Sequence, residues 1–190
     1  MTRDEAWNLL CEYVKDESLR KHMLAVEAAM RHYAKLLGGD VEQWGVVGLL
    51  HDFDYERWPN PPEHSREGAK ILRQRGVDEE VVGAVLAHAD WNLDEFPRDR
   101  PIRKAIAAVD ELCGFLVACA LVRPTRLEGM EPKSVRKKMK TPAFAAAVKR
   151  EDITKGAELL GLSLDEHIAN CIAALQPIAG ELGLKAPPGA

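Results

Sequence analysis

The sequence predicts an all-α protein that folds as a single domain. Apolar residues recur with a helical period along most of the chain, and no segment shows the alternation that is typical of a strand. Glycines, prolines and capping residues divide this pattern into segments of helical length. At 190 residues the chain is long enough for one hydrophobic core, and no repeat or linker divides it.

The first half of the chain divides into five expected helices, separated by capping and breaking residues. Ser18 is a plausible N-cap, Gly38 and Gly39 end a helix, and Asp40 and Asp78 can each cap the helix that follows. The expected helices cover residues 2–14, 18–37, 40–51, 62–75 and 78–88.

The second half begins with a polar loop at residues 90–100. Pro101 then opens the longest apolar helix, which we expect to end at residue 121 or 122. Further helices are expected at residues 142–150 and 163–182. Before them lies a basic run, Lys133 to Lys140, which is either a solvated face or a rim that steers polyanionic substrates.

Composition limits the classes of function. The 26 basic and 30 acidic residues give a net charge of −4, which argues against general nucleic-acid binding. The four cysteines are far apart and form no Cys-x-x-Cys pair, so neither a zinc finger nor a disulfide framework is indicated. The N-terminus resembles no signal segment, and no apolar run reaches about 18 residues. We therefore expect a cytoplasmic enzyme or binding protein with no membrane partner.

Several histidines and aspartates lie beside the apolar stripes of the expected helices. A buried carboxylate needs a cation or hydrogen-bond donors, and imidazole and carboxylate groups are ligands of divalent metal ions. Each residue taken singly could be an ordinary polar residue at a helix edge, but their joint occurrence indicates a metal site. The candidate ligands are His22, His51, Asp52, His64, His88 and Asp110.

The order His22, His51-Asp52, Asp110 resembles the HD superfamily of metal-dependent phosphohydrolases, whose defining ligands run His, His-Asp, Asp. The resemblance covers roughly residues 18–117 and includes the Leu-Leu-His-Asp context and the Val-Asp-Glu-Leu sequence around Asp110. It implies a single HD-domain helical bundle over residues 1–190. Within that bundle it implies a metal-binding core at 18–122 and a C-terminal helical extension at 123–190.

His64 and His88 resemble the two additional histidines of family members that bind two metals. The resemblance implies one ion held by His22, His51, Asp52 and Asp110. A second ion would be held by His64 and His88, with Asp52 as the bridge. The alternative is that these two histidines contact substrate or are merely polar pocket residues. Iron or manganese is the metal that the resemblance favours, with zinc, cobalt, magnesium and nickel as alternatives.

The implied activity is hydrolysis of a phosphoester or phosphoanhydride of a small phosphorylated metabolite or nucleotide. Two cations about 3.5–4 Å apart can share a water and lower its pKa, so that no side-chain nucleophile is required. The chain is most similar to the small bacterial HDIG-type group, although Phe53-Asp54 stands where Ile-Gly would be expected. Two alternatives remain open: an inactive regulatory module that binds metal or nucleotide, and a di-iron oxygenase-like protein.

Three residues are candidates for a direct catalytic role. Besides the bridging Asp52, Asp54 could orient the water or protonate a leaving oxygen, although a loop carboxylate is more often solvated. Lys104 could reach a phosphate, but it precedes Asp110 by six residues and lies roughly 120° away around the helix. Two loop tryptophans, Trp58 and Trp91, would either stack on a nucleobase or plug the edge of the core.

Overall fold

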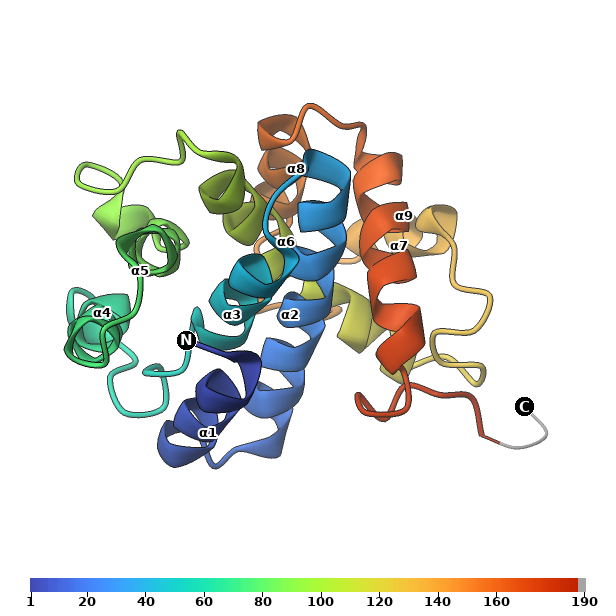
Figure 1. Cartoon of the computed structure of the whole chain (residues 1–190). Helices are drawn as coiled ribbons and strands as arrows, with labels where there is room; N and C mark the ends of the chain where they lie inside the picture. Colours follow the sequence, from blue (N-terminus) through green and yellow to red (C-terminus); the bar gives the residue numbers. More distant parts are fainter. Residues whose placement is uncertain (188–190) are drawn as a thin grey trace.

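A computed structural model describes residues 1–187, and all the regular structure within that range is helical (Figure 1). The helices are α1 Arg3–Tyr13, α2 Glu17–Leu37, α3 Val41–Leu50, α4 Glu63–Gln74, α5 Glu79–Ala87, α6 Pro101–Leu121, α7 Pro132–Met139, α8 Arg150–Leu159 and α9 Leu164–Leu175. Two 3-10 turns, η1 Asp90–Asn92 and η2 Gln176–Ile178, complete the regular elements. The predicted all-α fold class is confirmed.

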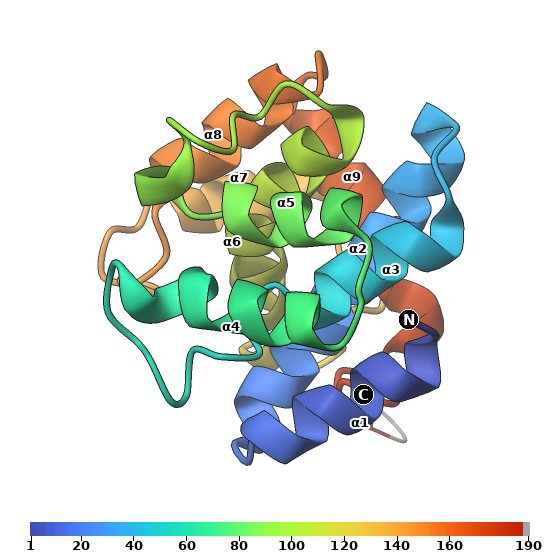
Figure 2. The ribbon, with the colours of Figure 1, turned by 60° about the vertical axis from the view of Figure 1, so that its left-hand side comes forward.

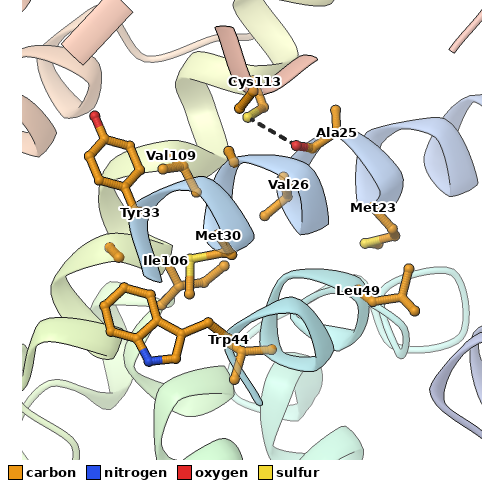
Figure 3. Close-up of a cluster of buried hydrophobic side chains, with 14 of the residues drawn as sticks. Met23, Ala25, Val26, Met30, Tyr33, Trp44, Leu49, Ile106, Val109 and Cys113 are labelled. Carbon is orange, nitrogen blue, oxygen red and sulfur yellow. Dashed lines mark hydrogen bonds between the residues drawn. The ribbon is translucent and has the colours of Figure 1, made fainter. Parts of the chain in front are cut away.

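Helix α2 is the centre of the bundle. It packs against α3, α6 and α9, which surround it in Figures 1 and 2. The middle of its apolar stripe is buried, from Met23 to Tyr33, as the helical spacing of these residues predicts. Figure 3 shows this core, in which side chains of α2 meet those of α3 and α6. The residues labelled there include Met23, Val26, Met30, Trp44, Leu49, Ile106 and Val109.

Helices α2 and α3 approach each other closely at a glycine. A Cβ atom added to Gly48 would lie 2.8 Å from the Cα atom of Glu27, so no larger residue fits without moving a helix. The buried carboxylate of Glu27 is held by two guanidinium groups, with Oε1 2.7 Å from Arg3 Nε and 3.0 Å from Arg31 Nε. These ion pairs offset the cost of burying the charge. The contact brings the C-terminal end of α3 against α2.

The helix ends follow the capping residues with one exception. Gly38 ends α2 in the left-handed conformation at φ 72°, and Asp40 accepts hydrogen bonds from two main-chain N–H groups of α3 at 2.9 Å. Asp78 caps α5 in the same way. The expected cap of α2 at Ser18 is wrong, because Asp16 accepts from the N–H of Leu19 at 2.7 Å and the helix begins one residue before Ser18.

The expected helix at residues 142–150 is wrong. Residues 142–147 form turns, and helix α8 begins at Arg150. The Arg150 guanidinium donates to the carbonyl oxygens of Phe144, Ala145 and Val148, which supplies partners that a helix would otherwise provide. Long-range contacts therefore override the helix propensity of the alanine-rich segment. The basic run lies largely in α7, and the last expected helix ends early, at Leu175.

Helix α6 runs through the bundle and contacts α2, α5, α8 and α9. Pro101 occupies its first turn and Val122 follows its last residue, as predicted. Apolar residues of α6 are buried against these neighbours, and Asp110 lies beside them. Among the described residues, no helix combines the length and the apolar character needed to cross a membrane.

Candidate metal centre

Helices α3 and α5 each end at a histidine whose Nδ1–H donates to a carbonyl oxygen of the last turn. His51 Nδ1 lies 2.8 Å from the oxygen of Gly48, and His88 Nδ1 contacts the oxygen of Val85. A main-chain carbonyl can only accept, so each bond places the proton on Nδ1 and the lone pair on Nε2. The two rings are 5.4 Å apart, so the two helix ends direct coordinating nitrogens to the same place.

The six candidate ligands come together in the fold and form two groups that share Asp52. In the first group, atoms of His22, His51 and Asp52 lie within 4.8 Å of one another. In the second, atoms of Asp52, His64 and His88 do so. Asp52 is therefore placed between the two groups, where a bridging carboxylate would have to be.

Asp110 of α6 also lies beside the first group. Its Oδ1 atom lies 3.0 Å from Nε2 of His22 and 3.4 Å from Nε2 of His51. His22 and Asp110 are 88 residues apart in sequence and meet because α2 and α6 pack together. The four residues of the first expected ion thus surround one region.

The second group is more compact. Nε2 of His64 and Nε2 of His88 lie 3.1 and 3.0 Å from Oδ1 of Asp52, and 3.3 Å from each other. His64 reaches this position because α4 is interrupted. The ψ angle of His64 is 136°. The next residue, Ser65, has a φ angle of 61°, a left-handed conformation that is costly for a residue other than glycine. Such strain is characteristic of functional sites.

Buried polar groups hold the interrupted start of α4. Asp54, which is fully buried, accepts from Nδ1 of His64 at 3.0 Å and from the N–H of Gly68 at 2.8 Å. Asn92 donates to Oγ of Ser65 at 2.8 Å. Arg66 is engaged with Asn92 and Glu95 and lies away from the cluster. The carboxylate of Asp54 therefore orients His64, a role that supporting residues commonly have around metal ligands.

The donor atoms fit a divalent metal ion. Nε2 of His51 is buried without a hydrogen bond among the described residues, since its nearest carboxylate oxygens are 3.4 and 3.6 Å away. Oδ1 of Asp52 is also without a hydrogen bond, although two imidazole nitrogens lie within 3.1 Å of it. A bound cation would satisfy lone pairs that converge in this way, and nitrogen with carboxylate oxygen suits iron, manganese, cobalt or zinc.

The pKa values of the cluster also favour a bound cation. Burial disfavours a charged imidazole, but Asp52 and Asp110 outweigh burial and raise the pKa of His51 to about 9. The pKa of His64 is also raised to about 9, because Asp52 and Asp54 outweigh burial. Burial would raise the carboxyl pKa values, yet His51 holds the pKa of Asp52 and of Asp110 below the usual range. Positive charge is stabilised here, as protons or as metal.

A cavity of about 360 Å³ opens beside the cluster. Asp52, His64, His88 and Asp110 face it. Aromatic and charged side chains from other elements complete its walls, among them Tyr55, Trp91, Glu111, Lys149, Asp152 and Lys155. The cavity could admit a small phosphorylated molecule to the ligand atoms.

The predicted catalytic residues other than Asp52 lie outside this cavity. Asp54 is behind His64, and Lys104 is not part of the lining. Of the two loop tryptophans, Trp91 lines the cavity, whereas Trp58 packs 6.4 Å from the ring of Tyr13. The geometry gives no direct contact to support a catalytic role for Asp54 or Lys104, and both roles stay predictions.

The model of one protein family, described as the HD domain, matches residues 19–157. The chain belongs to the HD domain family. The family is predominantly one of metal-dependent phosphohydrolases, and its members bind divalent metals. The predicted resemblance to the HD superfamily is thus confirmed, while the HDIG-type and two-metal assignments stay predictions. Comparisons with curated proteins and with solved structures give no match.

The HD domain match includes a part of the chain whose contribution to the site the sequence did not reveal. Lys149 and Lys155 line the cavity, and neither was a candidate. The signal that could have indicated helix α8 was the helical spacing of Ile153 and Ala157, together with the acidic residues in the first turn of this helix. The boundary expected at residue 122 stays a prediction, although the cavity includes residues beyond it.

Proposed function

We propose that this protein is a metal-dependent phosphohydrolase that cleaves a phosphoester or phosphoanhydride bond of a small phosphorylated molecule. The observation that carries the proposal is the arrangement of two ligand groups that share Asp52, a residue that lines one cavity together with Asp110, His64 and His88. Membership in a family of mostly metal-dependent phosphohydrolases supports it. A nucleotide is among the candidate substrates.

In this proposal the ligands divide between two ions. His22, His51, Asp52 and Asp110 would hold the first, and Asp52 with His64 and His88 would hold the second, a division that the contacts within the two groups support. When bound, such ions supply a water of lowered pKa and neutralise charge on phosphoryl oxygens. Iron or manganese is our preferred metal.

The protein itself has three roles at this site. Asp52 keeps the two groups together, because it touches members of both. The main-chain and Asp54 contacts engage Nδ1 of three histidine rings, which leaves Nε2 of each ring to the carboxylates of the cluster. The helices around the cluster bury His51 completely. A buried, oriented set of ligands is what such chemistry requires.

The test is hydrolysis of p-nitrophenyl phosphate and bis(p-nitrophenyl) phosphate with a panel of divalent metals, together with measurement of bound metal. We expect Asp52→Ala to lose both metal and turnover. Asp94→Ala, which changes an exposed aspartate in the loop after α5, is the control and should keep both.

Three results would contradict the proposal. Full turnover in metal-stripped Asp52→Ala protein would show that the cluster is not responsible. Stoichiometric metal with no hydrolysis of any phosphate ester would favour a binding module, and colour with redox activity would favour oxygen chemistry.

A further inference from the structure

One wall of the cavity is formed by the start of α8, directly beside a candidate ligand. The main-chain N–H of Lys149 donates to Oε2 of Glu111 at 3.2 Å, and Glu111 follows Asp110 in α6. Lys149 and Lys155 both contribute to the cavity lining. The wall therefore carries two ammonium groups on the side of the site where the Asp110 carboxylate lies.

This wall is held firmly on α6. A Cβ atom on Gly156 would lie 2.8 Å from the Cα atom of Ala108, so the two helices touch through their backbones. The Arg150 guanidinium lies 5.0 Å from the ring centre of Phe115 and also binds carbonyl oxygens of the preceding turns. In Figure 2, α8 lies on one side of α5 and α4 on the other. Lys149 is thus presented by a rigid element.

In the described part of the chain, ion pairs engage several charges of the lining, but not Lys149, and the Glu111 carboxylate accepts only the main-chain N–H of Lys149. Arg98 lies 2.8 Å from Asp90, and Lys155 lies 3.6 Å from Asp152. Within residues 1–187, Lys149 has no ion pair. An unpaired ammonium at the edge of a cavity is available to an anionic ligand.

The cavity lining near His64 is aromatic. Tyr55 and Trp91 are 43% and 44% exposed, which is high for such large side chains. Their rings lie 5.1 and 5.7 Å from the ring of His64, and both residues line the cavity near the second ligand group. The cavity therefore carries two lysines among the acidic residues near Asp110 and two aromatic rings near His64.

We propose that Lys149, assisted by Lys155, binds the non-bridging oxygens of a terminal phosphoryl group. The substrate is then a dianionic phosphomonoester or a terminal phosphoanhydride rather than a phosphodiester, and its leaving group lies against Tyr55 and Trp91. The inference rests on the proposed hydrolase function. The physical reason is charge: a terminal phosphoryl group carries one more negative charge than a diester, and Lys149 offers one cation beyond the ligand cluster.

The test compares two esters with the same leaving group. In Lys149→Met, we expect KM for p-nitrophenyl phosphate to rise about 10- to 100-fold, the loss typical of a hydrogen bond to a charged group. KM for bis(p-nitrophenyl) phosphate should change less than about three-fold. Lys149→Arg should keep most of the monoester affinity. Lys137→Met, which changes an exposed lysine of α7, is the matched control.

A second measurement needs no turnover. Inorganic phosphate is titrated calorimetrically into the metal-loaded wild type and variants, with metal content and urea midpoint measured for each. We expect the Kd for phosphate to rise about ten-fold or more in Lys149→Met at unchanged metal content. Equal effects on the two esters, or phosphate binding that is unaffected, would overturn the inference and leave the hydrolase proposal intact. If the wild type cleaves neither ester, the hydrolase proposal fails and the phosphate titration alone decides this inference.

Discussion

Nδ1 of His64 lies 3.0 Å from Oδ1 of Asp54, on the side of the ring that faces away from the cavity. Because a carboxylate accepts, this contact holds the proton on Nδ1 and leaves Nε2 free for Asp52 and His88. The buried Asp54 thus selects the tautomer of a candidate ligand from behind.

Asp54→Asn should weaken the second metal site. The amide can donate as well as accept, so it no longer enforces one tautomer of His64, and changes of this kind typically cost about 10- to 100-fold in metal affinity. Metal affinity is measured by competition with a chelator. Asp94→Asn, in an exposed loop, is the control, and equal affinity in the two variants would refute the orienting role.

Variants of single histidines should separate the two ions. His22→Ala removes a member of the first group only and His88→Ala a member of the second only, so each should keep about one metal equivalent if the ligands divide as proposed. Asp52→Ala should keep none. Metal content is read by mass spectrometry of dialysed protein. Complete loss in both histidine variants would show that the groups form one indivisible site.

The stability of the metal-free protein should fall at alkaline pH. The pKa values of His51 and His64 are raised in the folded state from 6.5 to about 9. Their contribution is therefore fully present below pH 6.5 and is lost as the pH rises through about 9. Urea unfolding across this range measures the decline in the free energy of unfolding.

The metal-loaded protein supplies the comparison for that pH series. Its ligand imidazoles are already deprotonated, so the alkaline decline should be absent, and metal uptake at neutral pH should release protons. His64→Gln should flatten the decline in the metal-free protein. A decline that is equally steep with and without metal would assign it to other groups.

Gly156→Ala should destabilise the protein by about 1–3 kcal/mol, the usual cost of overpacking. The added methyl group would lie 2.8 Å from the Cα atom of Ala108. The backbone cannot relieve this contact by changing rotamer, as a side chain can. Urea unfolding measures the effect. Gly180→Ala is the control, because a Cβ atom there meets nothing within 4 Å, and similar losses in both variants would contradict the close packing of α8 on α6.

Local signals in the sequence predicted much of the helical frame. Gly38, Asp40 and Asp78 act on main-chain groups within a few residues, so their positions were enough to place helix ends. The alanine-rich segment 142–147 misled because its propensity for helix is weak compared with the hydrogen bonds that Arg150 makes to its carbonyl oxygens. Those bonds depend on where α8 and α6 meet.

By itself, the sequence determined that the chain is helical and which histidines and aspartates are candidates for ligands. Both depend on residue type, order and helical period, which can be read along one dimension. Only the tertiary structure decided that Asp54 stands behind His64, that Lys104 lies off the cavity and that Lys149 lines it. A helical period shows which residues share a face, but what that face meets depends on packing between elements that are distant in the chain.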